Sequence, residues 1–146
     1  MKRIVFGGVL ALAMIGLTAI GQAQVPSIVG DWTGAFSYVG YNDGYHNAPS
    51  IPLRIENQTG SLFRGYFIES SGGTNWLSGN IQPNLAVANA WDVTMAARNS
   101  DETVLAITGF LTTNAPAKIS RVQMMVFPPD NGPWGNAMVA GKWKKQ

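Results

Sequence analysis

The chain of 146 residues contains no cysteine and a single histidine, and charged residues make up only 12% of it. The missing cysteine excludes a disulfide scaffold, a thiolate metal site and a cysteine nucleophile. One histidine excludes a multi-histidine metal site, and we expect no metal and no other cofactor. Average soluble domains carry about 25% charge, so this composition with its 17 glycines argues against a disordered tail and against a helical bundle.

Residues 1–23 have the pattern of a secretory signal peptide. Lys2 and Arg3 form a short positive region, residues 4–20 are uncharged, and small residues precede a cleavage site between Ala23 and Gln24. An uncleaved membrane anchor is the alternative, but this uncharged stretch is short for a span of about 20 residues. We therefore expect bacterial export to the periplasm or medium, with no stable membrane insertion after cleavage.

Amino-terminal sequencing of the exported protein is expected to return Gln24 as the first residue, because small residues at positions −3 and −1 direct cleavage. Retention of residues 4–20 in the mature protein would contradict this prediction.

Removal of Lys2 and Arg3 would leave eight basic and eight acidic residues, so the mature chain is formally neutral. The other bases are scattered, apart from three lysines at the very end, and no basic patch with interleaved aromatic residues is recognisable. Nucleic acid is therefore not an expected partner.

Residues 24–146 are predicted to form a single all-β domain. Apolar residues recur with period two between short polar turns, and no segment offers a crossover helix, so neighbouring strands should pair antiparallel. Eight strands can close a barrel whose interior holds side chains and one small ligand. We predict an eight-stranded antiparallel up-and-down β-barrel, with a two-sheet sandwich as the structural alternative. The expected strands cover residues 29–39, 51–56, 62–70, 74–82, 85–98, 103–113, 117–127 and 137–144.

Several motifs resemble the avidin and streptavidin family of calycin-type barrels. A Gly-x-Trp at the start of the first strand is shared by lipocalins and avidins, and here it is Gly30-Asp31-Trp32. The resemblance implies a closed barrel, a plug at its closed end formed by Trp32, and association through the late strands. The other similar segments are Gly60-Ser61-Leu62-Phe63-Arg64-Gly65-Tyr66-Phe67, Trp91-Asp92-Val93-Thr94-Met95, Thr108-Gly109 and Gln123-Met124.

The departures from this family imply that biotin is not the ligand. The family's biotin-binding asparagine falls on Gly34, and its third-strand tyrosine falls on Phe67. Three pocket tryptophans of the family fall near Met95, Met124 and Met138. Polar ligand groups left unpaired in a buried pocket would be costly, whereas a methionine-lined cavity suits an apolar ligand of loose shape.

We expect an exported protein that binds a small apolar or amphipathic ligand in the barrel and is not an enzyme. Trp32 is the expected structural residue, lying inside near one end beneath the stem of a base such as Arg121 or Lys142. The candidate ligand-binding residues are Phe36, Tyr38, Phe67, Met95, Met124 and Met138.

Two other readings stay open. An interaction protein, such as an inhibitor of a secreted protease or lysozyme, would act through an end loop formed by residues 41–50. A small outer-membrane barrel fits poorly, because the outward faces of the early strands carry Arg54, Glu56 and Arg64.

Catalytic groups are sparse. His46 is the only imidazole base, and nothing nearby marks a nucleophile, so a surface-loop histidine is expected. Asp31, Glu69 and Asp92 are the candidate paired carboxylates of a glycosidase, but the alternation with neighbouring tryptophans points Asp31 and Asp92 outward.

The late strands predict a homo-oligomer. A strand that is apolar on both faces should be covered on both, and the barrel interior covers only one, so a second subunit is the expected cover. In residues 103–113, Val104, Ala106 and Phe110 oppose Leu105, Ile107 and Leu111; in residues 117–127, Ile119, Met125 and Phe127 oppose Val122, Met124 and Val126.

Overall fold

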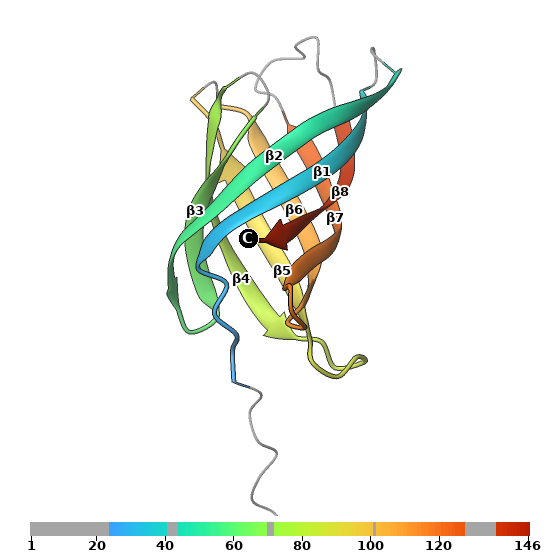
Figure 1. Ribbon diagram of the computed structural model, residues 1–146. Coiled ribbons are helices and arrows are strands. Elements are labelled where there is room, and N and C mark those ends of the chain that lie inside the picture. The colour runs from blue at the N-terminus through green and yellow to red at the C-terminus, as the bar shows by residue number, and fades with distance from the viewer. Residues whose placement is uncertain (1–23, 41–43, 70–71, 101, 128–136) are drawn as a thin grey trace, which may run out of the picture.

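The computed structural model describes residues 24–40, 44–69, 72–100, 102–127 and 137–146. Each strand pairs antiparallel with the next, and β8 pairs with β1, so the sheet closes into a barrel (Figure 1). The predicted eight-stranded all-β barrel is confirmed. Among the described residues, no helix is long and apolar enough to cross a membrane. The strands are β1 (Gly30–Gly40), β2 (Gly44–Thr59), β3 (Leu62–Ile68), β4 (Thr74–Pro83), β5 (Ala90–Arg98), β6 (Val104–Thr112), β7 (Lys118–Phe127) and β8 (Ala137–Lys145).

The barrel has two different ends (Figure 1). At the upper end β1, β3, β5 and β7 finish, and β2, β4, β6 and β8 begin. The lower end carries the β2–β3, β4–β5 and β6–β7 connections, and the amino-terminal segment enters there. The expected signal peptide and its cleavage site after Ala23 lie outside the described residues, apart from Gln24 itself.

Two strands start far from their predicted positions, β2 at Gly44 rather than residue 51 and β5 at Ala90 rather than residue 85. β2 starts at Gly44 because its first residues continue the pairing with β1 as far as Gly40. It also holds two extra residues, shown by register shifts opposite residues 34–36 of β1 and between residues 55 and 57. The expected end loop 41–50 is therefore wrong for residues 44–50, which are strand. β5 starts late, at Ala90, because Asn84 forms a turn: its side-chain oxygen accepts two backbone N–H groups, and its own N–H donates to the Ala90 carbonyl.

Alternate residues of every strand fill the barrel interior, as the period-two pattern predicts. In β5, for example, Trp91, Val93 and Met95 are buried while Asp92 and Thr94 are exposed. The largest fully buried side chains are Trp32, Trp143, Phe67, Ile28, Leu53, Ile55, Ile81, Ile107, Leu111, Ile119, Met124 and Val93.

Two glycines make room for the two aromatic rings in the middle of the barrel. Phe36 and Trp143 pack edge to face with ring centres 4.7 Å apart. A Cβ atom at Gly34 or Gly141 would overlap the Phe36 ring. The Trp143 indole N–H donates to the Ile51 carbonyl at 3.0 Å, which pairs its buried polar atom. Gly34 corresponds to the ligand-binding asparagine of the family that the chain resembles, and here the side chains of Phe36 and Trp143 cover it.

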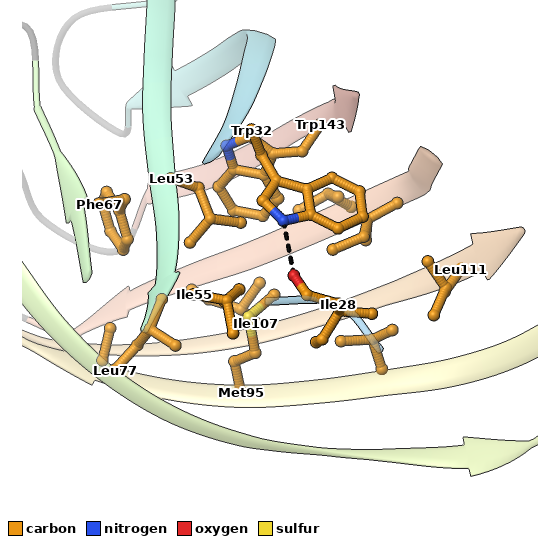
Figure 2. Close-up of a cluster of buried hydrophobic side chains, with 14 of the residues drawn as sticks. Ile28, Trp32, Leu53, Ile55, Phe67, Leu77, Met95, Ile107, Leu111 and Trp143 are labelled. Carbon is orange, nitrogen blue, oxygen red and sulfur yellow. Dashed lines mark hydrogen bonds between the residues drawn. The ribbon is translucent and has the colours of Figure 1, made fainter. Parts of the chain in front are cut away.

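Trp32 closes the lower end together with the amino-terminal segment. Its side chain is only 1% exposed, and its indole N–H donates to the Ile28 carbonyl at 3.0 Å (Figure 2). Gln58 accepts the Ile28 backbone N–H at 2.8 Å. The predicted interior position of Trp32 is confirmed. A late-strand base lies over Trp32 as predicted, but it is Lys145 rather than Arg121 or Lys142. Its ammonium lies 5.8 Å from the centre of the indole ring, since Lys145 is the strand partner of Trp32.

An extra residue in β7 changes which of its side chains face inward. The register shifts between Ile119 and Val122 against β8, and Arg121 has a φ of 52°. Ile119 is consequently buried on the same side as Val122 and Met124, rather than on the side of Met125 as predicted. A bulge of this kind reverses the period-two pattern on one side of itself.

Candidate functional site

The inner wall at the upper end combines aromatic, aliphatic and polar side chains. Val139 of β8 lies between Tyr38 of β1 and Met124 of β7, its direct strand partners. Phe67 of β3 pairs with Asn75 of β4 in the same way. We call these five residues the upper wall. They are positioned by the strand alternation that also builds the core below them.

Asn75 is the polar residue in the otherwise hydrophobic core of the described chain, and its side chain is fully buried. Its amide NH₂ donates to the Glu69 carboxylate at 2.7 Å. Because only the NH₂ group can donate to a carboxylate, this bond also fixes the direction of the amide oxygen. That oxygen has no hydrogen-bond partner. A buried acceptor left unpaired costs about 1–3 kcal/mol, so the position is suited to receive a donor group from a bound molecule.

Asn75 was missed by the sequence reasoning. The signal was present: in the expected strand of residues 74–82, the period-two pattern places it on the face of Leu77 and Ile81. A polar residue on the buried face of a strand either has a hydrogen-bond partner within the protein or is available to bind a ligand.

The six expected ligand-binding residues separate into three groups. Phe36 and Met95 lie deeper, in the packed core, while Phe67, Met124 and Tyr38 belong to the upper wall. Tyr38 is half-buried at the rim, and its ring stacks on that of His46 with centres 4.9 Å apart.

Met138 does not line the interior, contrary to the prediction. Its side chain is 50% exposed, and its strand partners Val39 and Met125 are exposed as well. The inward position next to it belongs to Val139. Trp143, which the sequence reasoning did not single out, is the tryptophan of β8 that faces inward.

The candidate catalytic groups are not gathered into one site. Asp31 forms an ion pair with Arg54 at 2.9 Å on the outer surface. Asp92 is also exposed and accepts a hydrogen bond from Asn84, whereas Glu69 binds Asn75. Among the described residues, no three His, Asp or Glu side chains gather where they could hold a metal ion.

Comparison with known proteins adds no family. No protein-family model matches the chain, and no curated protein matches it.

Proposed function

We propose that this protein binds a small amphipathic ligand at the upper end of its barrel and is not an enzyme. The observation that carries the proposal is the unpaired, buried amide oxygen of Asn75. An N–H or O–H group of the ligand would donate to this oxygen. The apolar part of the ligand would lie against Phe67, Met124 and Val139, above the layer formed by Phe36 and Trp143.

The avidin-like relationship is likewise a proposal. A closed eight-stranded antiparallel barrel supports it, as does the burial of Trp32 at the closed end. The absence of biotin-binding groups at Gly34 and Phe67 argues for a different ligand.

Native mass spectrometry of the protein purified from its own host tests the binding proposal. A co-purified molecule at a fixed ratio is expected, and its mass and fragmentation would give its chemical class. A chain that carries no molecule, and gains none from a host metabolite extract, would contradict the proposal.

The variant Asn75→Leu is expected to separate binding from stability. Leucine removes the unpaired acceptor but also the donor to the Glu69 carboxylate, so the two effects oppose each other and the melting temperature of the ligand-free protein should change little, while ligand retention falls about tenfold or more. Asn80→Leu is the matched control, because Asn80 also has an unpaired side-chain oxygen but lies on the outward side of the same strand. Unchanged retention in Asn75→Leu would refute the role of Asn75.

We also propose export of the chain, with Gln24 as its mature first residue. Val25 and Ile28 pack against the barrel core, so cleavage after Ala23 would preserve the whole closure of the lower end.

Self-association through the late strands is a further proposal. Exposed apolar side chains adjoin one another across strands at the upper end: Val39 pairs with Met138, Met138 with Met125, and Val104 with Phe127. Sedimentation velocity at micromolar concentration is expected to show an oligomer that Met125→Glu dissociates and Thr94→Glu does not. A soluble monomer would defeat this prediction.

A further inference from the structure

Four cationic side chains meet on the outer face of β7 and β8, toward the lower end. We call Lys118, Arg121, Lys142 and Lys144 the cation face. Lys118 and Lys144 are direct strand partners, and Lys142 precedes Lys144 by two residues on the same side of β8. Arg121 projects from the β7 bulge, with its guanidinium 5.7 Å from the centre of the Phe110 ring. The interpretation of Lys118 and Arg121 as scattered is therefore wrong, since strand pairing places them beside the terminal lysines.

No ion pair of the described residues involves the cation face. Those ion pairs join Arg54 to Asp31 and Arg98 to Glu102. Like charges directly opposite in a sheet are destabilising, and a closed barrel cannot relieve them by moving its strands apart. An anionic partner would relieve them. The direct strand partners of these lysines on β1 and β6 are the uncharged Thr33, Ala35 and Thr112. The nearest carboxylates in the strand register are already engaged, Asp31 with Arg54 and Asp92 with Asn84.

An apolar tip projects from the same end of the barrel. The β4–β5 connection, residues 84–89, extends beyond the strands at the lower end (Figure 1). Leu85 at its tip is fully exposed, and Val87 is 48% exposed. The side-chain oxygen of Asn84 accepts two backbone N–H groups and holds the connection in shape.

The apolar tip and the cation face are neighbours. Val87 and Thr113 line the same groove at the lower end. Thr113 opens the β6–β7 connection, which runs directly into Lys118. Neither connection, residues 84–89 or 113–117, contains a charged side chain. The lower end thus presents an uncharged, partly apolar tip beside a group of cations.

We propose that the lower end docks on a lipid bilayer surface that carries anionic headgroups. Leu85 and Val87 enter the boundary between headgroups and acyl chains, and the cation face contacts the headgroups. Apolar insertion combined with several basic residues is the pair of signals that gives reversible surface binding.

Two features of the cation face favour lipid over single-stranded nucleic acid. Base binding relies on exposed aromatic rings, and the ring on this face, Phe110, is half-buried with Arg121 lying over it. Three of the four cations are lysines. A lysine ammonium acts as a point charge, whereas an arginine guanidinium can bind one phosphate through two hydrogen bonds. Docking of the lower end leaves the upper end facing away from the membrane, so the candidate ligand site stays accessible.

Vesicle co-sedimentation tests this proposal with the exported protein, its amino terminus verified by sequencing. We expect binding to vesicles of phosphatidylcholine mixed with phosphatidylglycerol, weak binding to phosphatidylcholine alone, and release by high salt. The double variant Lys118→Gln/Lys144→Gln should bind about 25-fold more weakly, because each surface cation contributes roughly fivefold. Leu85→Ser should bind about tenfold more weakly. Leu85→Ser changes a fully exposed side chain and should leave the melting temperature unchanged. The double variant should melt at the same or a slightly higher temperature, because it removes two like charges that lie directly opposite each other.

Two control variants separate docking from general adhesion. Arg64→Gln removes an exposed charge from β3, and Trp76→Ala removes an exposed apolar side chain from β4. Both should bind like the parent protein. The proposal is overturned by equal binding to neutral vesicles, by binding to neither kind, by equal losses in the controls, or by binding to a single-stranded oligonucleotide without binding to vesicles.

Discussion

Replacing Trp32 with alanine is expected to lower the free energy of unfolding by about 3–5 kcal/mol, the usual cost of removing a large aromatic side chain from a core. The side chain is 1% exposed, and its N–H bonds the carbonyl of Ile28. The substitution therefore leaves a cavity and also releases the amino-terminal segment from the lower end. The total free energy of unfolding of a small domain is about 5–15 kcal/mol. The melting temperature should therefore fall by more than about 10 °C, or unfolding should lose its cooperativity.

Two further variants separate the parts of this effect. Trp32→Phe retains most of the apolar contact but leaves the Ile28 carbonyl without its donor, so we expect a loss of about 1–3 kcal/mol. Trp76→Ala is the matched control, because Trp76 lies on the outer face and is 60% exposed. This substitution should lower the free energy of unfolding by less than about 1 kcal/mol. Equal melting of Trp32→Ala and the parent protein would show that Trp32 does not close the barrel.

Gly65→Ala is the second substitution with a large expected effect. A Cβ atom at Gly65 would overlap the backbone carbonyl of Arg54 and lie 2.9 Å from the Cα of Ile55. Backbone atoms cannot rotate away as a side chain can, so β2 and β3 would have to separate. We expect a loss of about 3 kcal/mol or more, at the upper end of the range for overpacking, measured by urea unfolding followed by tryptophan fluorescence.

Ser78→Thr is the control for this prediction. It adds one methyl group at an exposed position of β4, the strand that pairs with β3, and should change stability by less than about 0.5 kcal/mol. If Gly65→Ala were as stable as Ser78→Thr, the close approach of β2 to β3 at this point would be refuted.

The strands, their number and most of their inward faces follow from local sequence. The alternation of residues 91–95 predicts which side chains of β5 are buried, because successive side chains of any strand point to opposite faces. Closure could also be argued from sequence, since eight short strands without helices have few other ways to cover their edges. Trp32 was identifiable for the same reason, as part of an alternating run and a recognisable motif.

Other features depend on which residues meet across strands, and local sequence does not contain that information. The extra residue at Arg121 buries Ile119 on the side of Val122. Nothing in the composition of β7 marks this change, because both faces are apolar there. For Met138, the family alignment was one residue away from the inward position that Val139 occupies, and a shift of one residue turns a strand side chain to the other face.

The sequence by itself determined an all-β domain of eight strands with Trp32 on an inward face, because period two is a property of each strand alone. The tertiary structure decided that the strands close into a barrel rather than a two-sheet sandwich. Only the tertiary structure decided the groups on which the proposals rest. Asn75 and Glu69 are only six residues apart, but the sequence does not show that the amide oxygen of Asn75 is buried without a hydrogen-bond partner. The closed barrel shows this. Lys118 and Lys144 are distant in the chain and adjacent in the sheet. The register of strand pairing brings the two lysines together and buries Asn75. This register is set by contacts between neighbouring strands, not by the residues of one strand alone.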